Sequence, residues 1–141
     1  MRGAYLLLIK VKRKAKVRVG KLGSIVLESG WYAYVGSAFG KSLNLLSRVE
    51  RHFKRRKKLR WHVDFLLAHG LVSLEGAILL PSKKRIECKI SKLLEKRAEK
   101  GVEGFGCSDC RCKAHLYYFK SKQKLLSTLR NLDFQKLNPK N

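Results

Sequence analysis

The stretch "WYAYVGSAFGKSLNLLSRVERHF", residues 31–53, joins an aromatic segment to a segment with helical periodicity. Its first seven residues are rich in the aromatic and β-branched side chains that are typical of strands. Its second half repeats apolar residues at intervals of three or four, which predicts the buried face of a helix formed by Leu43, Leu46, Val49 and Phe53. Arg48 and His52 are four residues apart, so they share a different face of that helix.

The connection between this strand and this helix, Gly36 to Ser42, is similar to a phosphate-binding loop. It has three residues between its two glycines, whereas the phosphate-binding loop has four. No later strand ends in the Asp that would position Mg²⁺ in such a site. We therefore reject a nucleotide-binding loop. Lys41 and Ser42 remain candidates to contact a phosphate at the N-terminus of the helix.

Outward from this stretch, short strands and helices are separated by Gly and charged turns. Strands are predicted at 3–11, 15–20, 31–37, 74–81 and 116–120, with a turn at Gly23 that leads to Gly30. Helices are predicted at 42–53, 61–70, 85–101 and 123–134. The order β-β-β-α-α-β-α-β-α predicts an α/β (α+β) fold, in which helices flank a small, mixed and largely antiparallel sheet. We expect one domain over residues 1–141, with a Cys-rich loop at 104–115 and a closing strand and helix at 116–134.

The charge of the chain points to a polyanionic partner. Thirty-three Lys and Arg residues against ten Asp and Glu residues give a formal net charge of +23. Such an excess disfavours compaction by self-repulsion, and nucleic acid is the leading partner because neutralised phosphates release counterions. The basic run at 53–60 directly follows the first helix. This run and two basic residues before it give the predicted phosphate contacts, which are Lys41, Arg51, Lys54, Arg55, Arg56, Lys57, Lys58 and Arg60.

A membrane is not the expected partner, and an anionic membrane surface is only a weaker alternative to nucleic acid. The apolar run at 4–9, "AYLLLI", has six residues and is followed at once by basic residues. It is too short for a membrane span or for the apolar region of a signal peptide. We expect a cytoplasmic protein whose cysteines are reduced, bound to metal or buried.

The Cys-rich loop carries a compact set of metal-ligand residues in the pattern C-x2-C-x-C-x2-H. The set consists of Cys107, Cys110, Cys112 and His115. Four nitrogen and sulfur ligands are compatible with a tetrahedral zinc site. The Cys-x-Cys spacing is not that of a common zinc finger. A buried loop packed by small side chains, or a disulfide that involves Cys88, are equally open alternatives.

Three short motifs around the opening stretch carry a resemblance to a known superfamily. They are Gly3-Ala4-Tyr5, Tyr34-Val35-Gly36 and the R-x-x-x-H helix, and Glu87 follows near the start of the third helix. Together they resemble the GIY-YIG nuclease superfamily. The chain is most similar to an archaeal branch of it, a domain of unknown function that also occurs fused to endonuclease III-like proteins. The resemblance covers most of residues 3–119 and includes the Cys-rich segment.

The chain departs from the superfamily pattern near its first motif. Ala4 stands where the superfamily usually has Ile. The gap between Tyr5 and Tyr34 is longer than usual and is filled by an apparent extra hairpin. Gly30-Trp31-Tyr32 therefore competes with Gly3-Ala4-Tyr5 as the first motif.

The resemblance implies a metal-dependent endonuclease that hydrolyses phosphodiester bonds, with DNA favoured over RNA. Tyr5 and Tyr34 match the two motif tyrosines, one of which would activate or orient the attacking water. Arg48 matches the arginine that contacts the scissile phosphate, and His52 matches a frequent helix histidine. Glu87 matches the carboxylate that holds Mg²⁺ or Mn²⁺. These residue types suit the reaction, because phosphodiester cleavage needs a positioned nucleophile, a donor to developing charge and often a metal.

A non-catalytic DNA- or RNA-binding module on the same fold is the alternative, because the charge fits it equally well. A structure in which Tyr5, Tyr34, Arg48 and Glu87 do not converge on one concave surface would leave only the binding module. His62 and Asp64 stand as polar residues in the apolar segment "WHVDF". We expect them to make structural hydrogen bonds first and to line a substrate groove second.

Overall fold

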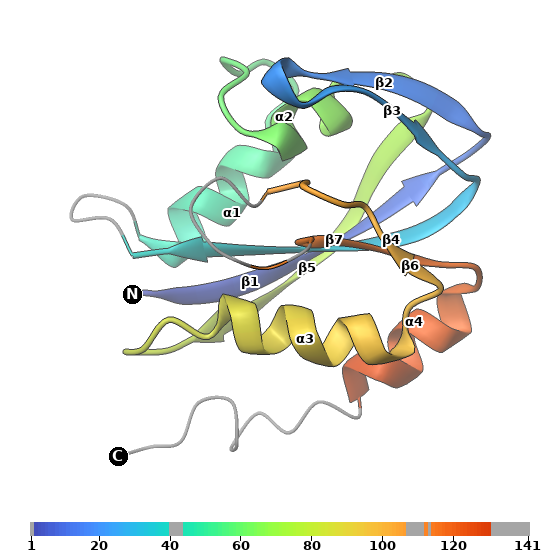
Figure 1. Cartoon of the computed structure of the whole chain (residues 1–141). Coiled ribbons are helices and arrows are strands. Elements are labelled where there is room, and N and C mark those ends of the chain that lie inside the picture. Colours follow the sequence, from blue (N-terminus) through green and yellow to red (C-terminus); the bar gives the residue numbers. More distant parts are fainter. Residues whose placement is uncertain (1, 40–43, 107–111, 113, 131–141) are drawn as a thin grey trace.

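The structure is a computed structural model that describes residues 2–39, 44–106, 112 and 114–130 (Figure 1). Its strands are β1 (Gly3–Val11), β2 (Ala15–Val19), β3 (Gly23–Leu27), β4 (Gly30–Ala38), β5 (Val72–Pro81), β6 (Lys100–Gly101) and β7 (Leu116–Phe119). Its helices are the 3₁₀ turn η1 (Gly20–Leu22) and the α-helices α1 (Leu45–Phe53), α2 (His62–Leu67), α3 (Glu87–Arg97) and α4 (Lys122–Arg130).

Five strands form one sheet in the order β5-β1-β4-β7-β6, and β2 pairs with β3 in a separate hairpin. The α+β class and the flanking helices are confirmed. The expected mixed character is wrong for the described strands, because every pairing among them is antiparallel. The prediction of three strands before the first helix is also wrong. The chain reverses at Gly23, whose φ of 90° favours glycine, and residues 23–27 then form a fourth strand.

The sheet separates two layers of helices and two apolar cores (Figure 1). Successive side chains of a strand point to opposite faces. In β1, Tyr5 and Leu7 enter the core beneath α1, α2 and the hairpin. Ala4 and Leu6 enter the core beneath α3 and α4. Because β1 is buried on both faces, its sequence is an almost unbroken apolar run rather than an alternation.

The buried face of α1 differs from the predicted one. It consists of Leu45, Val49 and His52, whereas Leu46 and Phe53 are 47% and 50% exposed. Leu43, which was also predicted to be buried, lies outside the described residues. The spacing of the true face is equally helical, but a histidine occupies its third position, so an apolar pattern does not reveal it. Asn44 caps the helix by accepting a 2.8 Å hydrogen bond from the Leu46 amide.

Several predicted ends shift by a few residues. The third helix was expected at 85–101 but ends at Arg97, because Lys100 and Gly101 pair with β7 as strand β6. The second helix ends at Leu67, and β5 begins two residues early, at Val72, which pairs with Val11. The closing helix is described from Lys122 to Arg130, and residues 131–134 of its predicted span lie outside the described part. No helix of the described residues is long and apolar enough to cross a membrane.

Candidate active site

A cavity of about 600 Å³ opens beside the edge of β4. Strand β7 pairs with β4 only from Trp31 to Tyr34, and residues 35–37 beyond that point line the cavity. Arg48 of α1 and residues 60–62, which lead into α2, form one wall. The remaining lining residues are Tyr5, Tyr34, Arg85, Glu87, Cys88, Gly106 and His115.

The cavity brings together Tyr5, Tyr34, Arg48 and Glu87, as the nuclease hypothesis requires. They come from four different elements, namely β1, β4, α1 and α3. Tyr32, the alternative to Tyr5, does not line this cavity. Its hydroxyl instead donates a 2.9 Å hydrogen bond to the carbonyl of Glu28.

Gly36 makes room for Tyr5. The two residues are direct partners in the pairing of β1 with β4. A Cβ atom at position 36 would overlap the ring and hydroxyl of Tyr5. The Tyr34 ring lies next to that of Tyr5, with the two centroids 6.3 Å apart. The glycine of one motif therefore positions the tyrosine of the other at the base of the cavity.

Tyr5 and His52 form a buried hydrogen-bonded pair. The Tyr5 hydroxyl lies 2.7 Å from Nε2 of His52, and Nδ1 of His52 lies 3.9 Å from the Asp64 carboxylate. Burial lowers the pKa of His52 to about 4, against the opposing effect of Asp64, so the ring is neutral at pH 7. Burial, and then Tyr34, raise the pKa of Tyr5 well above its ordinary value. The phenol therefore stays protonated, and its O–H group donates the hydrogen bond to Nε2.

The buried Asp64 carboxylate accepts hydrogen bonds at both of its oxygen atoms. It accepts hydrogen bonds from the Arg51 guanidinium at 2.9 and 3.1 Å and from the Arg60 and Trp61 amides at 2.9 and 3.0 Å. Burial alone would raise the pKa of Asp64, but the hydrogen bonds from Arg51 and from these amides outweigh it and hold the pKa below its usual value. The structural role expected for Asp64 is its observed one, and it does not line the cavity.

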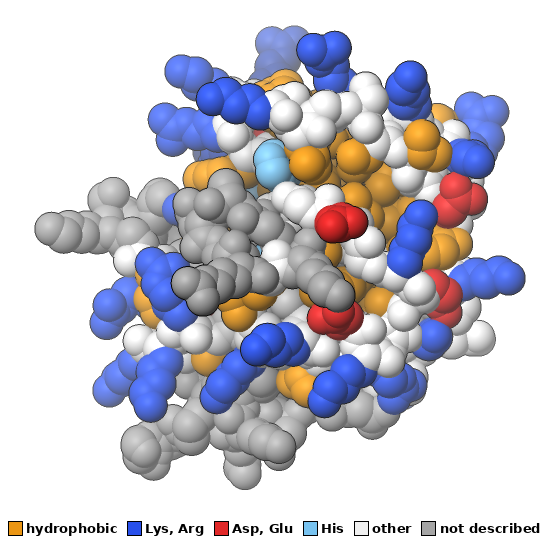
Figure 2. Space-filling view, in the orientation of Figure 1, with side chains coloured by type: hydrophobic (Ala, Val, Ile, Leu, Met, Phe, Trp, Pro, Cys, Tyr) orange, Lys and Arg blue, Asp and Glu red, His pale blue; other side chains and the backbone are white. Residues whose placement is uncertain are grey.

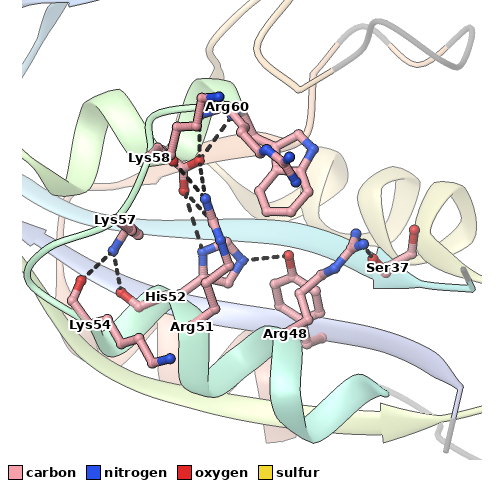
Figure 3. A network of polar contacts seen from close by, with 11 residues as sticks. Ser37, Arg48, Arg51, His52, Lys54, Lys57, Lys58 and Arg60 are labelled. Atoms are coloured by element: carbon pink, nitrogen blue, oxygen red, sulfur yellow. Dashed lines mark hydrogen bonds and ion pairs between the residues drawn. The ribbon is translucent and has the colours of Figure 1, made fainter. Parts of the chain in front are cut away.

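Two of the predicted phosphate contacts are used inside the protein (Figure 3). Arg51 pairs with Asp64 and also donates to the Lys58 carbonyl at 2.7 Å. The Lys57 ammonium donates to the carbonyls of His52 and Lys54 at the end of α1, at 2.9 and 2.7 Å. The side chains that remain exposed are Lys54, Arg55, Arg56, Lys58 and Arg60, and Lys41 lies outside the described residues.

Arg48 is held against the wall of the cavity by Trp61. Its guanidinium lies 4.6 Å from the centre of the Trp61 ring and donates a 2.8 Å hydrogen bond to the Ser37 carbonyl (Figure 3). The Nε atom of Arg48 is buried, and no described residue accepts a hydrogen bond from it. The side chain thus has a fixed position and an unused donor, which suits an anionic ligand.

Glu87 is the first residue of α3. Its Oε1 atom lies 3.5 Å from the Arg85 guanidinium. Its Oε2 atom is buried and has no hydrogen-bond partner among the described residues. An unpaired, buried carboxylate oxygen beside a cavity fits the donor set of Mg²⁺ or Mn²⁺, which commonly bind through one carboxylate together with phosphate oxygens and waters.

The lining of the cavity includes His62 and three residues that the sequence did not indicate. The Gly106 amide donates a 2.8 Å hydrogen bond to Nδ1 of His62, so the neutral ring carries its proton on Nε2. His62 therefore has both the structural hydrogen bond and the place in a groove that we expected. Trp61, Arg85 and Gly106 also line the cavity, although the sequence indicated no role for them in a site.

A group of metal-ligand residues adjoins the cavity. The sulfur atoms of Cys88 and Cys112 and a ring nitrogen of His115 all lie within 4.8 Å of one another. Cys112 and His115 belong to the zinc set expected from the sequence. Cys107 and Cys110 lie outside the described residues. Cys88, considered above only as a disulfide partner, joins the group from α3.

Comparison with protein families gives a match over most of the chain. The model of the family described as "Domain of unknown function DUF123" matches residues 4–137. Neither curated proteins nor solved structures gave a match.

Proposed function

The chain belongs to the DUF123 family, whose model spans nearly its whole length, and we propose that it is a metal-dependent nuclease of the GIY-YIG type. Its substrate is the phosphodiester backbone of nucleic acid, with DNA favoured over RNA. One observation carries the proposal: Tyr5, Tyr34, Arg48 and Glu87, distant in sequence, line one cavity. Cavities that gather a nucleophile-activating group, a cation and an unpaired carboxylate are typical of catalytic sites.

The Tyr5–His52 pair provides a route for the proton of the attacking water. As the water oxygen bonds to phosphorus, its proton passes to the Tyr5 oxygen and the phenolic proton passes to Nε2 of His52. The bond from phosphorus to the departing sugar oxygen then breaks, and that oxygen takes up a proton from solvent water. Because the His52 ring begins neutral, it can take this proton, and the Asp64 carboxylate 3.9 Å away offsets part of the cost of burying the imidazolium.

Arg48 and Glu87 act on the phosphate. The Arg48 guanidinium remains charged and donates to the phosphate oxygens as negative charge develops on them. Glu87 would hold the divalent cation through its unpaired Oε2 atom. When bound, such a cation supplies Lewis-acid stabilisation of the phosphate oxygens. Tyr34 lies beside Tyr5 and orients the water.

Cleavage assays on plasmid and branched DNA with Mg²⁺ or Mn²⁺ test this function. We expect Arg48→Ala and Glu87→Gln each to lower the cleavage rate by about 100-fold or more, since each removes charge stabilisation in the transition state. Glu50→Gln is the matched control, because Glu50 is exposed on α1 and does not line the cavity.

Two results would contradict the proposal. Equal rates in the wild type, Arg48→Ala and Glu87→Gln would assign the cleavage to a contaminant. Salt-sensitive DNA binding that is unchanged in Glu87→Gln, with no cleavage of any substrate, would identify a non-catalytic binding module.

A further inference from the structure

We propose that Cys88, Cys112 and His115 bind a zinc ion that tethers the first turn of α3 to the segment entering β7. This centre is separate from the divalent cation at Glu87, and its existence does not depend on the nuclease proposal. Cys88 lies at the start of α3, whereas Cys112 and His115 lie just before β7. The rest of α3 and β6 separate these two parts along the chain. The ion would thus connect elements that are not adjacent in the sequence.

The geometry requires only a small contraction. The three ligand atoms lie within 4.8 Å of one another. In a tetrahedral zinc site with Zn–S near 2.3 Å and Zn–N near 2.0 Å, ligand atoms are about 3.5 to 3.8 Å apart. A closure of roughly 1 Å would therefore place all three at bonding distance. His115 is 4% exposed, and both cysteines are partly buried, so the centre is sheltered from solvent.

His115 is already oriented as a zinc ligand. Its Nδ1 atom lies 3.1 Å from the Val35 carbonyl oxygen, which can only accept a hydrogen bond. Nδ1 therefore carries the proton, so Nε2 is the ring nitrogen that would bind the metal. Zinc-binding histidines usually donate their second ring N–H in this way. The backbone of His115 is fixed as well, because its amide donates to Phe105 and its carbonyl accepts from Val35, both at 2.9 Å.

The ligand types select zinc rather than the cation expected at Glu87. Thiolate and imidazole ligands favour zinc, whereas carboxylate and phosphate oxygens favour Mg²⁺ and Mn²⁺. Two cysteines and one histidine leave the fourth tetrahedral position to another ligand, such as water.

The position of the centre connects it with the cavity. Cys88 directly follows Glu87 in the first turn of α3, and Cys88 and His115 both line the cavity. A zinc ion on Cys88 would therefore restrict the movement of the Glu87 carboxylate relative to β4. Loss of zinc should loosen the start of α3 and lower the stability of the protein, whether or not it cleaves nucleic acid.

The test is metal analysis of the full chain, purified under reducing conditions without added zinc. We expect one zinc ion per chain, and, after exchange with Co²⁺, the visible absorption of a tetrahedral thiolate site. Cys88→Ser should weaken zinc binding at least tenfold in competition with a chromophoric chelator. Glu87→Gln is the control and should keep wild-type zinc, which separates this centre from the cation of the proposed reaction.

Metal analysis of the wild type tests the proposal by itself, even if the Cys88→Ser variant does not fold. Wild-type protein with neither zinc nor a tetrahedral Co²⁺ spectrum would overturn the proposal. So would mass spectrometry that finds Cys88 in a disulfide after purification without oxidant. Wild-type zinc affinity in a folded Cys88→Ser variant would remove Cys88 from the site.

Discussion

At position 36 of β4, glycine leaves the space that the Tyr5 ring occupies, and a Cβ atom there would overlap that ring. Alanine is otherwise no worse than glycine in a strand, because it restricts the unfolded chain. We predict that Gly36→Ala lowers the free energy of unfolding by about 1 to 3 kcal/mol, as overpacking in a close-packed core does. Urea denaturation measures the change, and the Tyr5 ring must move in any folded variant.

The matched control for this prediction is Gly76→Ala in β5. A Cβ atom at position 76 would meet only the Leu8 side chain, at an ordinary contact distance of 3.6 Å. We expect Gly76→Ala to be neutral or slightly stabilising. Equal losses at both positions would show that the effect comes from glycine in strands generally, rather than from the fit of Tyr5 over Gly36.

The buried His52 makes stability depend on pH. Its folded pKa of about 4 lies below the ordinary value of 6.5, so the folded state binds fewer protons than the unfolded chain between these values. The contribution of His52 is therefore complete above pH 6.5 and is lost as pH falls toward 4. The full loss corresponds to about 3 kcal/mol. We predict that His52→Gln flattens this part of the pH profile of unfolding free energy.

Comparison of the pH profiles of the wild type and His52→Gln isolates the contribution of His52 to stability. Burial lowers the pKa of His62 and His115 as well, so both proteins should retain some slope below pH 6.5. Glutamine at position 52 can preserve the hydrogen bond, because its side-chain oxygen can replace Nε2 as the acceptor of the Tyr5 hydroxyl. Parallel profiles for the wild type and His52→Gln would mean that folding does not shift the pKa of His52.

At the scale of elements, the sequence predicted which segments form helices better than it predicted how they pack. Periodicity identified α1, but it placed Leu46 and Phe53 in the core, where the structure has Leu45 and His52. Apolar patterns cannot identify a histidine that is buried because Tyr5 and Asp64 lie next to it. These partners come from β1 and α2, and only the tertiary fold brings them together.

Arg51 and Asp64 tie α1 to α2. The Asp64 side chain is fully buried, and Arg51 is the only side chain of the described residues that donates to it. Removal of one partner leaves a buried charge unpaired, which typically costs about 3 to 5 kcal/mol. We predict a loss near the lower end of that range for Arg51→Met, since the Arg60 and Trp61 amides still donate to Asp64. Chemical denaturation gives the value.

Arg55→Met is the matched control for the tie between α1 and α2. It removes the same charge from an exposed residue two positions beyond α1. We expect a change within about 0.5 kcal/mol, as for most surface substitutions. Should Arg51→Met be as mild as Arg55→Met, Arg51 would have to be returned to the set of residues available for phosphate contacts.

At the scale of the molecule, the sequence predicted the site residues from their order in known motifs, and the cavity was visible only in the structure. Tyr5, Tyr34, Arg48 and Glu87 were expected together because of a resemblance, whereas no site role was expected for Trp61 and Gly106. Trp61 lines the cavity because it packs against Arg48 and His52 of α1, and Gly106 because it lies beside Tyr34 of β4. Cys88 likewise approaches Cys112 and His115 only through the packing of α3. Spacing along a chain does not give such contacts between distant segments.

The net charge of +23 bears on the molecule as a whole, and Lys and Arg side chains project around the outline of the face in Figure 2. We predict that the logarithm of the DNA association constant falls linearly with the logarithm of salt concentration. For six to ten phosphate contacts, affinity should fall by about 10³- to 10⁵-fold between 50 and 200 mM salt. Fluorescence anisotropy with a labelled duplex measures this slope.

Two triple variants of equal charge locate the surface that binds DNA. Arg55, Arg56 and Lys58 are exposed and lie between α1 and the cavity wall at residues 60–62. Their replacement by Gln should reduce the slope by about 0.9 for each DNA phosphate that the variant no longer neutralises. Lys12, Arg13 and Lys16 are exposed in and near the turn at the far end of β1 from Tyr5, and their replacement should reduce it less. Equal reductions would mean that DNA is attracted by the overall charge and is not directed to the cavity.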